Sequence, residues 1–418
     1  MMGKIINYVK TNYKDFLSLV FFLVCYGTSI CLFLGGVKDP AAPSDLEFPL
    51  FLPLAIADIV LIIVFIFLEN RVFKVKINIP LIIVLSCLFI INLVVIATTP
   101  LENTISFTYP NQPESILVTI SNEYKVEYIL CFALLLFNIY ISFNYLLYRI
   151  KFNKSFAWLC CIIITAALIF VIYSYATEGE VYKLFFKNIK DVLVGYNPKS
   201  FTNHRNSYAA ILLGATFCSY AMNIITKKRF FYVFTLFFSI NVIFPMSRLC
   251  LMLLIVLTLM IFIYKMIVSW KEHSFRNLNL LMALVFVAVL LGLIAFNDIE
   301  LKKYIQHVLF TNNVTGKARQ LLWACALSIV KDFHIFIGLG HGYFNTVFAL
   351  ANGEHVKMPH NLYIQTYGAL GICGLIFLCA LISFIIYKII KLFKSNKDAA
   401  FVSLIGLIIV LSYYVVEG

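Results

Sequence analysis

Long apolar blocks dominate the hydrophobic pattern of this 418-residue chain. Each block is about 16–25 residues long, which is the length an α-helix needs to cross a hydrocarbon core of about 30 Å. Eleven such blocks are predicted, at 16–36, 49–68, 79–97, 128–147, 156–176, 207–225, 231–246, 249–268, 278–296, 362–387 and 399–416. The pattern predicts an all-α, polytopic transmembrane helix bundle with about 11–12 spans.

Two features of the block pattern leave the span count open. The block at 231–246 is short and contains Pro245 near its end, which indicates a break, although 231–268 can also be interpreted as one long re-entrant unit. Eleven spans would place Gly418 on the side opposite the amino terminus. A twelfth span that the pattern does not resolve is the alternative.

The composition excludes a water-soluble fold. Hydrophobic residues make up 62% of the chain and charged residues 13%, against roughly 45–50% apolar residues in soluble domains. No internal repeat or low-complexity linker divides the chain. We therefore expect a single transmembrane domain, residues 1–418, with two long extracytoplasmic loops at 177–206 and 297–361, the second of them partly helical.

The distribution of charge predicts the orientation. Nineteen of the 33 basic residues lie in six short polar regions that contain only four acidic residues, and such regions stay in the cytoplasm. The amino terminus is then cytoplasmic, and the first apolar block is an anchor because no small-residue cleavage site follows it. The net charge of +13 reflects this topology, so no nucleic-acid partner is expected.

The sequence offers little to bind a metal. None of the eleven cysteines forms a C-x-x-C pair, and the external acidic residues Asp298, Glu300 and Asp332 lack the spacing of metal ligands. We expect no metal, no disulfide framework and no cofactor.

One amphipathic segment and one glycine-rich segment stand out in the loop 297–361. Residues 317–332 are expected to form a helix, with one apolar side made of Leu321, Leu322, Cys325, Ile329 and Val330. The sequence Gly338-Leu339-Gly340-His341-Gly342 should end this helix. It does not follow a predicted strand, so a dinucleotide-binding role is rejected.

Six of the seven histidines are predicted to be external. We expect His307, His334, His341 and His355 to be solvated loop residues. His360 differs because Pro359-His360-Asn361 stands where the longest loop re-enters the membrane, so its imidazole is a candidate general base. Helix capping by the His-Asn pair is the alternative.

Only three arginines are predicted to be external, namely Arg205, Arg248 and Arg319. The planar guanidinium binds phosphate oxygens in bidentate fashion and stays charged when desolvated. With a histidine nearby, they predict a site for a lipid substrate that carries a diphosphate. Anchoring of these side chains at lipid headgroups is the alternative, and Asp58 inside a span is either a transporter group or a satisfied interior carboxylate.

The ordered motifs of residues 200–418 resemble the O-antigen ligase and polymerase family of bacterial membrane proteins. These motifs are Asn203-His204-Arg205-Asn206, Ser247-Arg248, Arg319-Gln320-Leu321-Leu322-Trp323, Gly338 to Phe344, and Pro359-His360-Asn361-Leu362-Tyr363 followed by Gly368 and Leu370-Gly371. The resemblance implies a many-helix membrane glycosyltransferase (C-type) fold. It also implies that Arg248, Arg319 and Arg205 bind the substrate diphosphate and that His360 is catalytic, with Asn361, Ser247 and His204 in support.

The function implied by this resemblance is polymerisation of undecaprenyl-diphosphate-linked oligosaccharide repeat units into an O-antigen or capsule. Two alternatives remain: a ligase that delivers finished glycan to a lipid core or protein, and a transporter or flippase of the lipid-linked unit. The protein should lie in the bacterial inner membrane, with its site on the periplasmic or extracellular side. A chain-length regulator and a flippase are expected partners.

Overall fold

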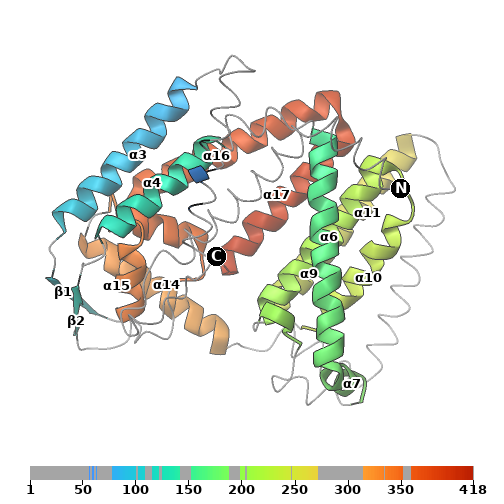
Figure 1. The fold of residues 1–418 in the computed structure, drawn as a ribbon, viewed down its shortest axis with the longest axis horizontal. Helices are drawn as coiled ribbons and strands as arrows, with labels where there is room; N and C mark the ends of the chain where they lie inside the picture. Colours follow the sequence, from blue (N-terminus) through green and yellow to red (C-terminus); the bar gives the residue numbers. More distant parts are fainter. Residues whose placement is uncertain are drawn as a thin grey trace. The chain divides into compact units, whose positions relative to one another are not determined.

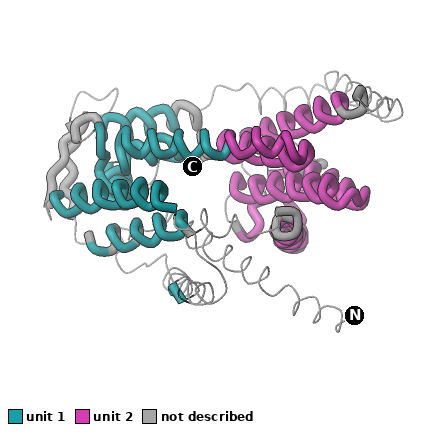
Figure 2. The backbone as a smooth tube through the Cα atoms, turned by 90° about the horizontal axis from the view of Figure 1, so that it is seen from above, with its two compact units in different colours: residues 1–156, 315–385, 417–418 teal, residues 157–314, 386–416 magenta. Residues whose placement is uncertain are grey.

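The computed structural model describes residues 78–99, 102–108, 115–121, 125–141, 152–187, 198–202, 205–245, 247–271, 314–333, 335–351 and 359–417, with four single positions between 56 and 63. The backbone divides into two compact units (Figure 2). Unit 1 comprises residues 1–156, 315–385 and 417–418, and unit 2 comprises residues 157–314 and 386–416.

Five helices among the described residues are long and apolar enough to cross a membrane. They are α3 (Ile79–Thr98), α6 (Phe152–Thr177), α9 (Arg205–Thr226), α11 (Arg248–Lys271) and α16 (Leu362–Ser395) (Figure 1). The helices α4 (Lys125–Ile141), α10 (Phe231–Ile243) and α17 (Lys397–Glu417) also coincide with predicted spans. The expected polytopic helical fold is confirmed, while the blocks 16–36, 278–296 and most of 49–68 lie outside the described residues.

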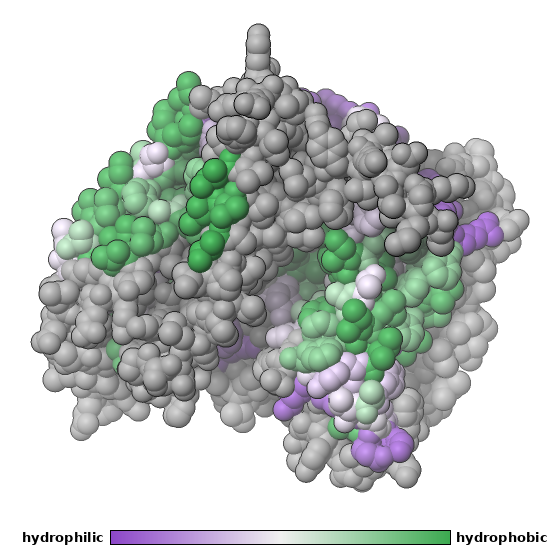
Figure 3. All heavy atoms as spheres, in the orientation of Figure 1, coloured by the Kyte–Doolittle hydropathy of each residue, from purple (hydrophilic) through white to green (hydrophobic). Residues whose placement is uncertain are grey.

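The surface of α3 shows why this chain needs a bilayer. Its side chains Ile79, Ile83, Ile90 and Val94 are each at least half exposed. Apolar side chains gather over α3 in Figure 3. Such a surface is unfavourable in water, whereas in lipid it has apolar neighbours and all helical backbone groups remain bonded to one another.

A β-hairpin lies between α3 and α4, where the span pattern predicted no regular element. The strands β1 (Glu102–Thr108) and β2 (Ser115–Ser121) pair antiparallel, with Glu102 opposite Ser121 and Thr108 opposite Ser115. Polar and apolar residues alternate over 104–108 and 118–121, which is the period of a strand. Counting spans alone therefore missed this element.

The segment 317–332 is helical as predicted, within α14 (Val314–Phe333) of unit 1. Its buried side consists of Cys325, Ala326, Ile329 and Val330, with Leu322 partly buried. Leu321 was placed on this side incorrectly, because it is 37% exposed. The buried side packs with Phe344 and Phe348 of the short helix α15 (Tyr343–Ala351) in one apolar cluster.

Helix α16 is interrupted at Gly371, which has φ 61° and ψ −154°. The glycine-rich segment before α15 pairs with this interruption. The amides of Leu339 and Gly340 donate to the carbonyls of Gly368 and Ala369, both at 2.9 Å, and the amide of Ile372 donates to the carbonyl of Ile335 at 2.9 Å. Backbone groups released by the break are thus bonded within the protein, which a membrane-embedded helix requires.

Glycines make this close pairing possible. Gly338, Gly340 and Gly342 all have positive φ angles, between 70° and 92°. A Cβ atom on Gly338 would lie 2.6 Å from backbone atoms of Ala369, Leu370 and Gly371. The helix α14 already ends at Phe333, so the prediction that the glycine-rich segment ends it is wrong; the segment instead completes the broken part of α16.

In unit 2, α10 ends at Ile243 and α11 begins at Arg248, so the predicted break near Pro245 is confirmed. The most buried of the five long helices is α9. Its small residues Ala209, Ala215 and Ala221 are fully buried, and they allow neighbouring helices to approach closely.

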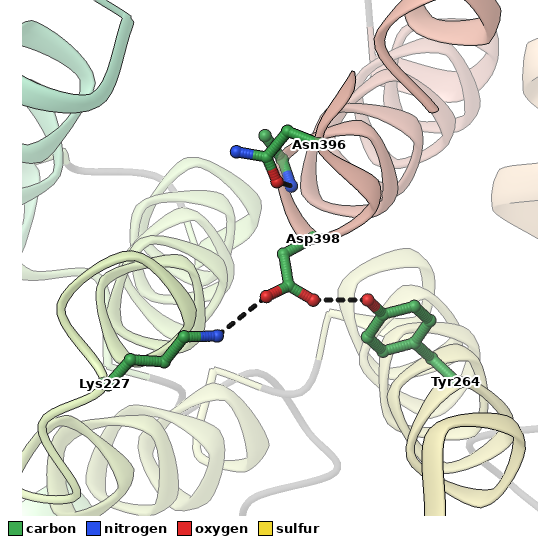
Figure 4. Close-up of polar contacts among 5 residues, drawn as sticks. Lys227, Tyr264, Asn396 and Asp398 are labelled. Carbon is green, nitrogen blue, oxygen red and sulfur yellow. Dashed lines mark hydrogen bonds and ion pairs between the residues drawn. The ribbon is translucent and has the colours of Figure 1, made fainter. Parts of the chain in front are cut away.

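One carboxylate joins three helix ends in unit 2 (Figure 4). Asp398 accepts hydrogen bonds from Lys227 Nζ at 2.7 Å and from the hydroxyl of Tyr264 at 2.5 Å. Beside it, the side chain of Asn396 accepts from the amide of Ala399 at 3.0 Å and caps the start of α17. This cluster ties the end of α9 to α11 and α17.

Candidate functional site

The segment that precedes α16 is held by α14. The indole Nε1 of Trp323 donates a 2.8 Å hydrogen bond to the backbone carbonyl of Pro359. Arg319 lies four residues before Trp323 on α14, and residues at this spacing share a helix face. Arg319 and His360, the residue after Pro359, are therefore brought to the same part of unit 1.

His360 adopts a left-handed backbone conformation, with φ 52°. For a residue other than glycine this costs roughly 1–3 kcal/mol, so the surrounding contacts must impose it. On one side Trp323 binds Pro359, and on the other the side chain of Asn361 accepts from the amides of Tyr363 at 2.9 Å and Ile364 at 3.1 Å. The capping bonds of the motif thus come from Asn361, and His360 is half-buried just before the first turn of α16.

His341 was expected to be solvated, and this prediction is wrong. Its residue is 6% exposed, and its backbone amide donates 2.7 Å to the side-chain oxygen of Asn92 on α3. The imidazole lies against the ring of Phe132 from α4, with ring centroids 5.3 Å apart. The pairing of the glycine-rich segment with α16 pulls His341 into the interior, which its loop position in the sequence did not indicate.

A pair of buried amides supports the same region. Gln365 donates through Nε2 to the side-chain oxygen of Asn345 on α15, and both residues are about 5% exposed. Gln365 stands one turn after Asn361, and its amide donates to the Asn361 carbonyl at 2.8 Å. The first turn of α16 is therefore fixed to α15 as well as to α14.

In unit 2, two arginines stand at helix starts. Arg205 is the first residue of α9 and Arg248 the first residue of α11. Their positive charges are near enough to interact electrostatically. Ser247, just before α11, is 2% exposed, and its carbonyl accepts from the amide of Leu251 at 2.9 Å. Two guanidinium groups whose charges interact, each at a helix amino terminus, form a region that favours an anion.

The segment before Arg205 is anchored by a carboxylate. Glu178, between α6 and the short helix α7 (Gly179–Lys187), accepts from the amides of Lys199 at 3.0 Å and Ser200 at 3.0 Å. The hydroxyl of Ser200 donates to the carbonyl of Phe170 at 2.8 Å. A single turn of 3₁₀ helix, η2 (Ser200–Thr202), then leads toward α9.

The sequence around these residues was also compared with known protein families. Residues 232–379 match the family described as O-antigen ligase. Over these residues, about a third of the chain, the sequence is similar to O-antigen ligases. Comparison with curated proteins gave no match.

The O-antigen ligase match covers the residues that the sequence resemblance emphasised. It includes Ser247, Arg248, Arg319, His360 and Asn361, whereas Arg205 precedes it. The match points to glycan transfer in polysaccharide assembly, and it does not separate a polymerase from a ligase. The expected family resemblance is thereby confirmed.

The site residues divide between the two units. Arg319, His360 and Asn361 belong to unit 1, and Arg205, Ser247 and Arg248 belong to unit 2. Each unit thus combines helix starts with residues suited to anion binding, and unit 1 adds an imidazole. In the described part of the chain, no three His, Cys, Asp or Glu side chains are grouped as metal ligands would be.

Several sequence predictions fall outside the described residues. These are the histidines His204, His307, His334 and His355 and the carboxylates Asp58, Asp298 and Glu300. The interpretation as a transporter depended on Asp58 and stays a prediction.

Some residues that support the candidate site were not predicted from the sequence. Asn92, Asn345 and Gln365 hold its backbone, and Glu178 anchors the segment before Arg205. One signal was available for Asn92, because a buried amide in the middle of an apolar span needs a partner. No comparable signal marks Asn345 and Gln365, because they are 20 residues apart in the sequence and meet only after folding.

Proposed function

We propose that the protein polymerises oligosaccharide repeat units carried on undecaprenyl diphosphate into a cell-surface polysaccharide, such as an O-antigen or capsule. The observation that carries the proposal is the bond from Trp323 to Pro359, which brings His360 toward the face of α14 that bears Arg319. Both residues lie within the region related to O-antigen ligases.

The proposed reaction needs one base and a site for negative charge. The acceptor sugar hydroxyl gives its proton to the imidazole of His360 while its oxygen bonds to the anomeric carbon of the donor. The bond between that carbon and the phosphate oxygen breaks, and its electron pair leaves with the lipid diphosphate. Because the diphosphate is already a good leaving group, stabilising its charge is the main electrostatic requirement.

Arg205, Arg248 and Arg319 supply this stabilisation in the proposal. Guanidinium forks match pairs of phosphate oxygens and form charge-assisted hydrogen bonds. The mutual repulsion of Arg205 and Arg248 supports the assignment, since a bound dianion would relieve it. Ser247, His204 and Asn361 are supporting neighbours of these groups.

The location belongs to the same proposal. We place the protein in the bacterial cytoplasmic membrane, with a cytoplasmic amino terminus, because basic residues gather in the loops assigned to that face. The reaction then occurs at the opposite face. A flippase must deliver the donor there, and a regulator of chain length is an expected partner.

A ligase is the second candidate, and the description of the matched family favours it. The same groups would transfer a finished glycan from the lipid diphosphate to a lipid core or a protein. The two functions share the donor and the base, and they differ in the acceptor. Measuring the length of the lipid-linked glycan separates them.

The test compares cells that carry wild type, His360→Ala or Arg248→Ala, with membrane levels of the protein measured in parallel. A polymerase predicts that both variants reach the membrane but accumulate single lipid-linked repeat units. A ligase predicts that long glycan accumulates on the lipid carrier. Normal surface polysaccharide in both variants would contradict the proposed site for either function.

A further inference from the structure

A second polar network lies at the α7 end of unit 2, apart from the residues assigned to catalysis. The carboxylate of Glu178 accepts a 2.5 Å hydrogen bond from the hydroxyl of Ser174, in addition to the amides of Lys199 and Ser200. Glu178 therefore joins the last part of α6 to the segment that leads to Arg205.

From Ser174 the network continues inward through two tyrosines. The hydroxyls of Ser174 and Tyr182 are 2.8 Å apart, and those of Tyr182 and Tyr208 are 3.4 Å apart. The three residues are at most 5% exposed. Burial raises the pKa of Tyr182, so its hydroxyl stays neutral and acts as a hydrogen-bonding group.

The network contacts segments that lie close in sequence to both Arg205 and Arg248. Tyr208 lies three residues after Arg205, about one turn along α9. The ring of Tyr182 packs edge-on against Phe244, with centroids 5.1 Å apart, and Phe244 stands four residues before Arg248. The side chain of Tyr182 thus contacts the helix that begins at Arg205 and the connection that leads to Arg248.

The charges of Arg205 and Arg248 explain why such a connection would matter for binding a diphosphate. The charges of Arg205 and Arg248 interact unfavourably, and a diphosphate between them would be attracted to both. A rigid hydrogen-bonded support lowers the reorganisation needed when a diphosphate arrives.

We propose that the network Glu178–Ser174–Tyr182–Tyr208 is a positioning device that holds Arg205 and Arg248 at the spacing required by the substrate diphosphate. Tyr182 is its central positioning residue. This inference rests on the proposed function, because it takes the two arginines as diphosphate ligands.

Removing single hydroxyls tests the network with little change in packing. Tyr182→Phe keeps the ring against Phe244 and loses both hydroxyl contacts, and Ser174→Ala breaks the link to Glu178. Tyr175→Phe is the matched control: its ring stacks on Tyr182 with centroids 4.1 Å apart, and the residue is 43% exposed. The full chain is purified in lipid nanodiscs, and its affinity for sugar-free undecaprenyl diphosphate is measured alongside thermal stability.

We expect Tyr182→Phe and Ser174→Ala to bind undecaprenyl diphosphate about tenfold more weakly, which corresponds to the loss of one buried hydrogen bond or slightly more. With glycan-bearing donor, KM for the donor should rise by the same factor while kcat and KM for the acceptor stay near wild type. Tyr175→Phe should match wild type in all three quantities.

Two results would overturn this inference alone. One is unchanged affinity in Tyr182→Phe and Ser174→Ala while Arg248→Ala binds weakly. The other is a parallel loss of kcat and thermal stability without a selective effect on donor binding, which indicates a purely structural role. Unchanged affinity in Arg248→Ala would overturn the proposed function itself, and this inference with it.

Discussion

The indole nitrogen of Trp323 lies 2.8 Å from the carbonyl oxygen of Pro359, and this bond links the helix of Arg319 to the residue before His360. It explains how a half-buried histidine with a left-handed backbone is kept in place. The amide cap from Asn361 fixes the other side of His360. Positioning of the imidazole therefore depends on residues that contribute no chemistry of their own.

Trp323→Phe tests this dependence. The variant keeps an aromatic ring but loses the donor to Pro359, at a cost of about 1 kcal/mol. We expect turnover to fall roughly fivefold to tenfold, with little change in donor affinity, because His360 and not the diphosphate site is disturbed. Steady-state kinetics with purified enzyme measures both quantities. Equal loss of donor affinity would show that Trp323 acts on the whole site.

Gly371→Ala tests the break in α16. A Cβ atom there would lie 2.4 Å from the carbonyl carbon of Phe336, and φ is 61°. Because neither the backbone contact nor the dihedral can relax easily, we expect little folded protein in size-exclusion chromatography. The control is Gly214→Ala on α9, where nothing lies within 4 Å. It should fold normally, with helix propensity favouring it by roughly 0.5–1 kcal/mol.

Asn92→Leu tests whether a helix outside the family match supports the site. The side-chain oxygen of Asn92 is the acceptor for the buried amide of His341, and an unpaired buried amide costs about 1–3 kcal/mol. We expect faster hydrogen exchange across 338–342 and activity reduced at least tenfold. Hydrogen exchange read by mass spectrometry measures the first effect. Unchanged exchange in this segment would show that Asn92 does not hold it.

The sequence predicted the spans well because each needs a long apolar run, whatever its neighbours are. It also placed the helix 317–332 and the break at Pro245, since local periodicity and a proline determine both. The hairpin was missed because its alternation is short and lies in a polar loop. His341 was misjudged for another reason: its burial follows from the pairing of Leu339 and Gly340 with α16, a contact between distant segments.

For the candidate site, residue type indicated which residues carry the chemistry. It did not indicate which residues hold them in place. Scarcity of external arginine and a histidine beside a proline pointed to Arg205, Arg248, Arg319 and His360. The residues proposed to hold them, such as Trp323, Tyr182 and Glu178, make hydrogen bonds that only the fold creates. No spacing rule in the sequence connects Ser174 with Tyr208.

Asp398 provides a pH-dependent test of the fold. Burial alone would raise its pKa, but hydrogen bonds from Lys227 and Tyr264 and the charges of Lys227 and Lys265 outweigh burial, so the pKa lies below its usual value. A depressed carboxyl pKa stabilises the folded state above the unfolded pKa of about 3.9, and this contribution is lost as the pH falls through the folded pKa.

Asp398→Asn should therefore lower the melting temperature modestly at pH 7, and the difference from wild type should shrink as the pH falls below about 4 and vanish below the folded pKa. The effect is small because the carboxylate is partly solvated. Lys394→Gln, an exposed lysine nearby, is the control and should change little. A difference that persists unchanged at low pH would contradict the assigned ionisation of Asp398.

The central claim is that this protein transfers glycan from a lipid diphosphate with His360 as base and Arg248 as diphosphate ligand. Its most direct test incubates purified protein with an undecaprenyl-diphosphate-linked oligosaccharide, in a chelator and without nucleotide sugar, and measures glycan length and free undecaprenyl diphosphate together. We predict longer lipid-linked glycan and matching carrier release for wild type, and neither product for His360→Ala or Arg248→Lys, which keeps the charge and loses the fork. Full activity in both variants, or no carrier release by wild type, would contradict the account.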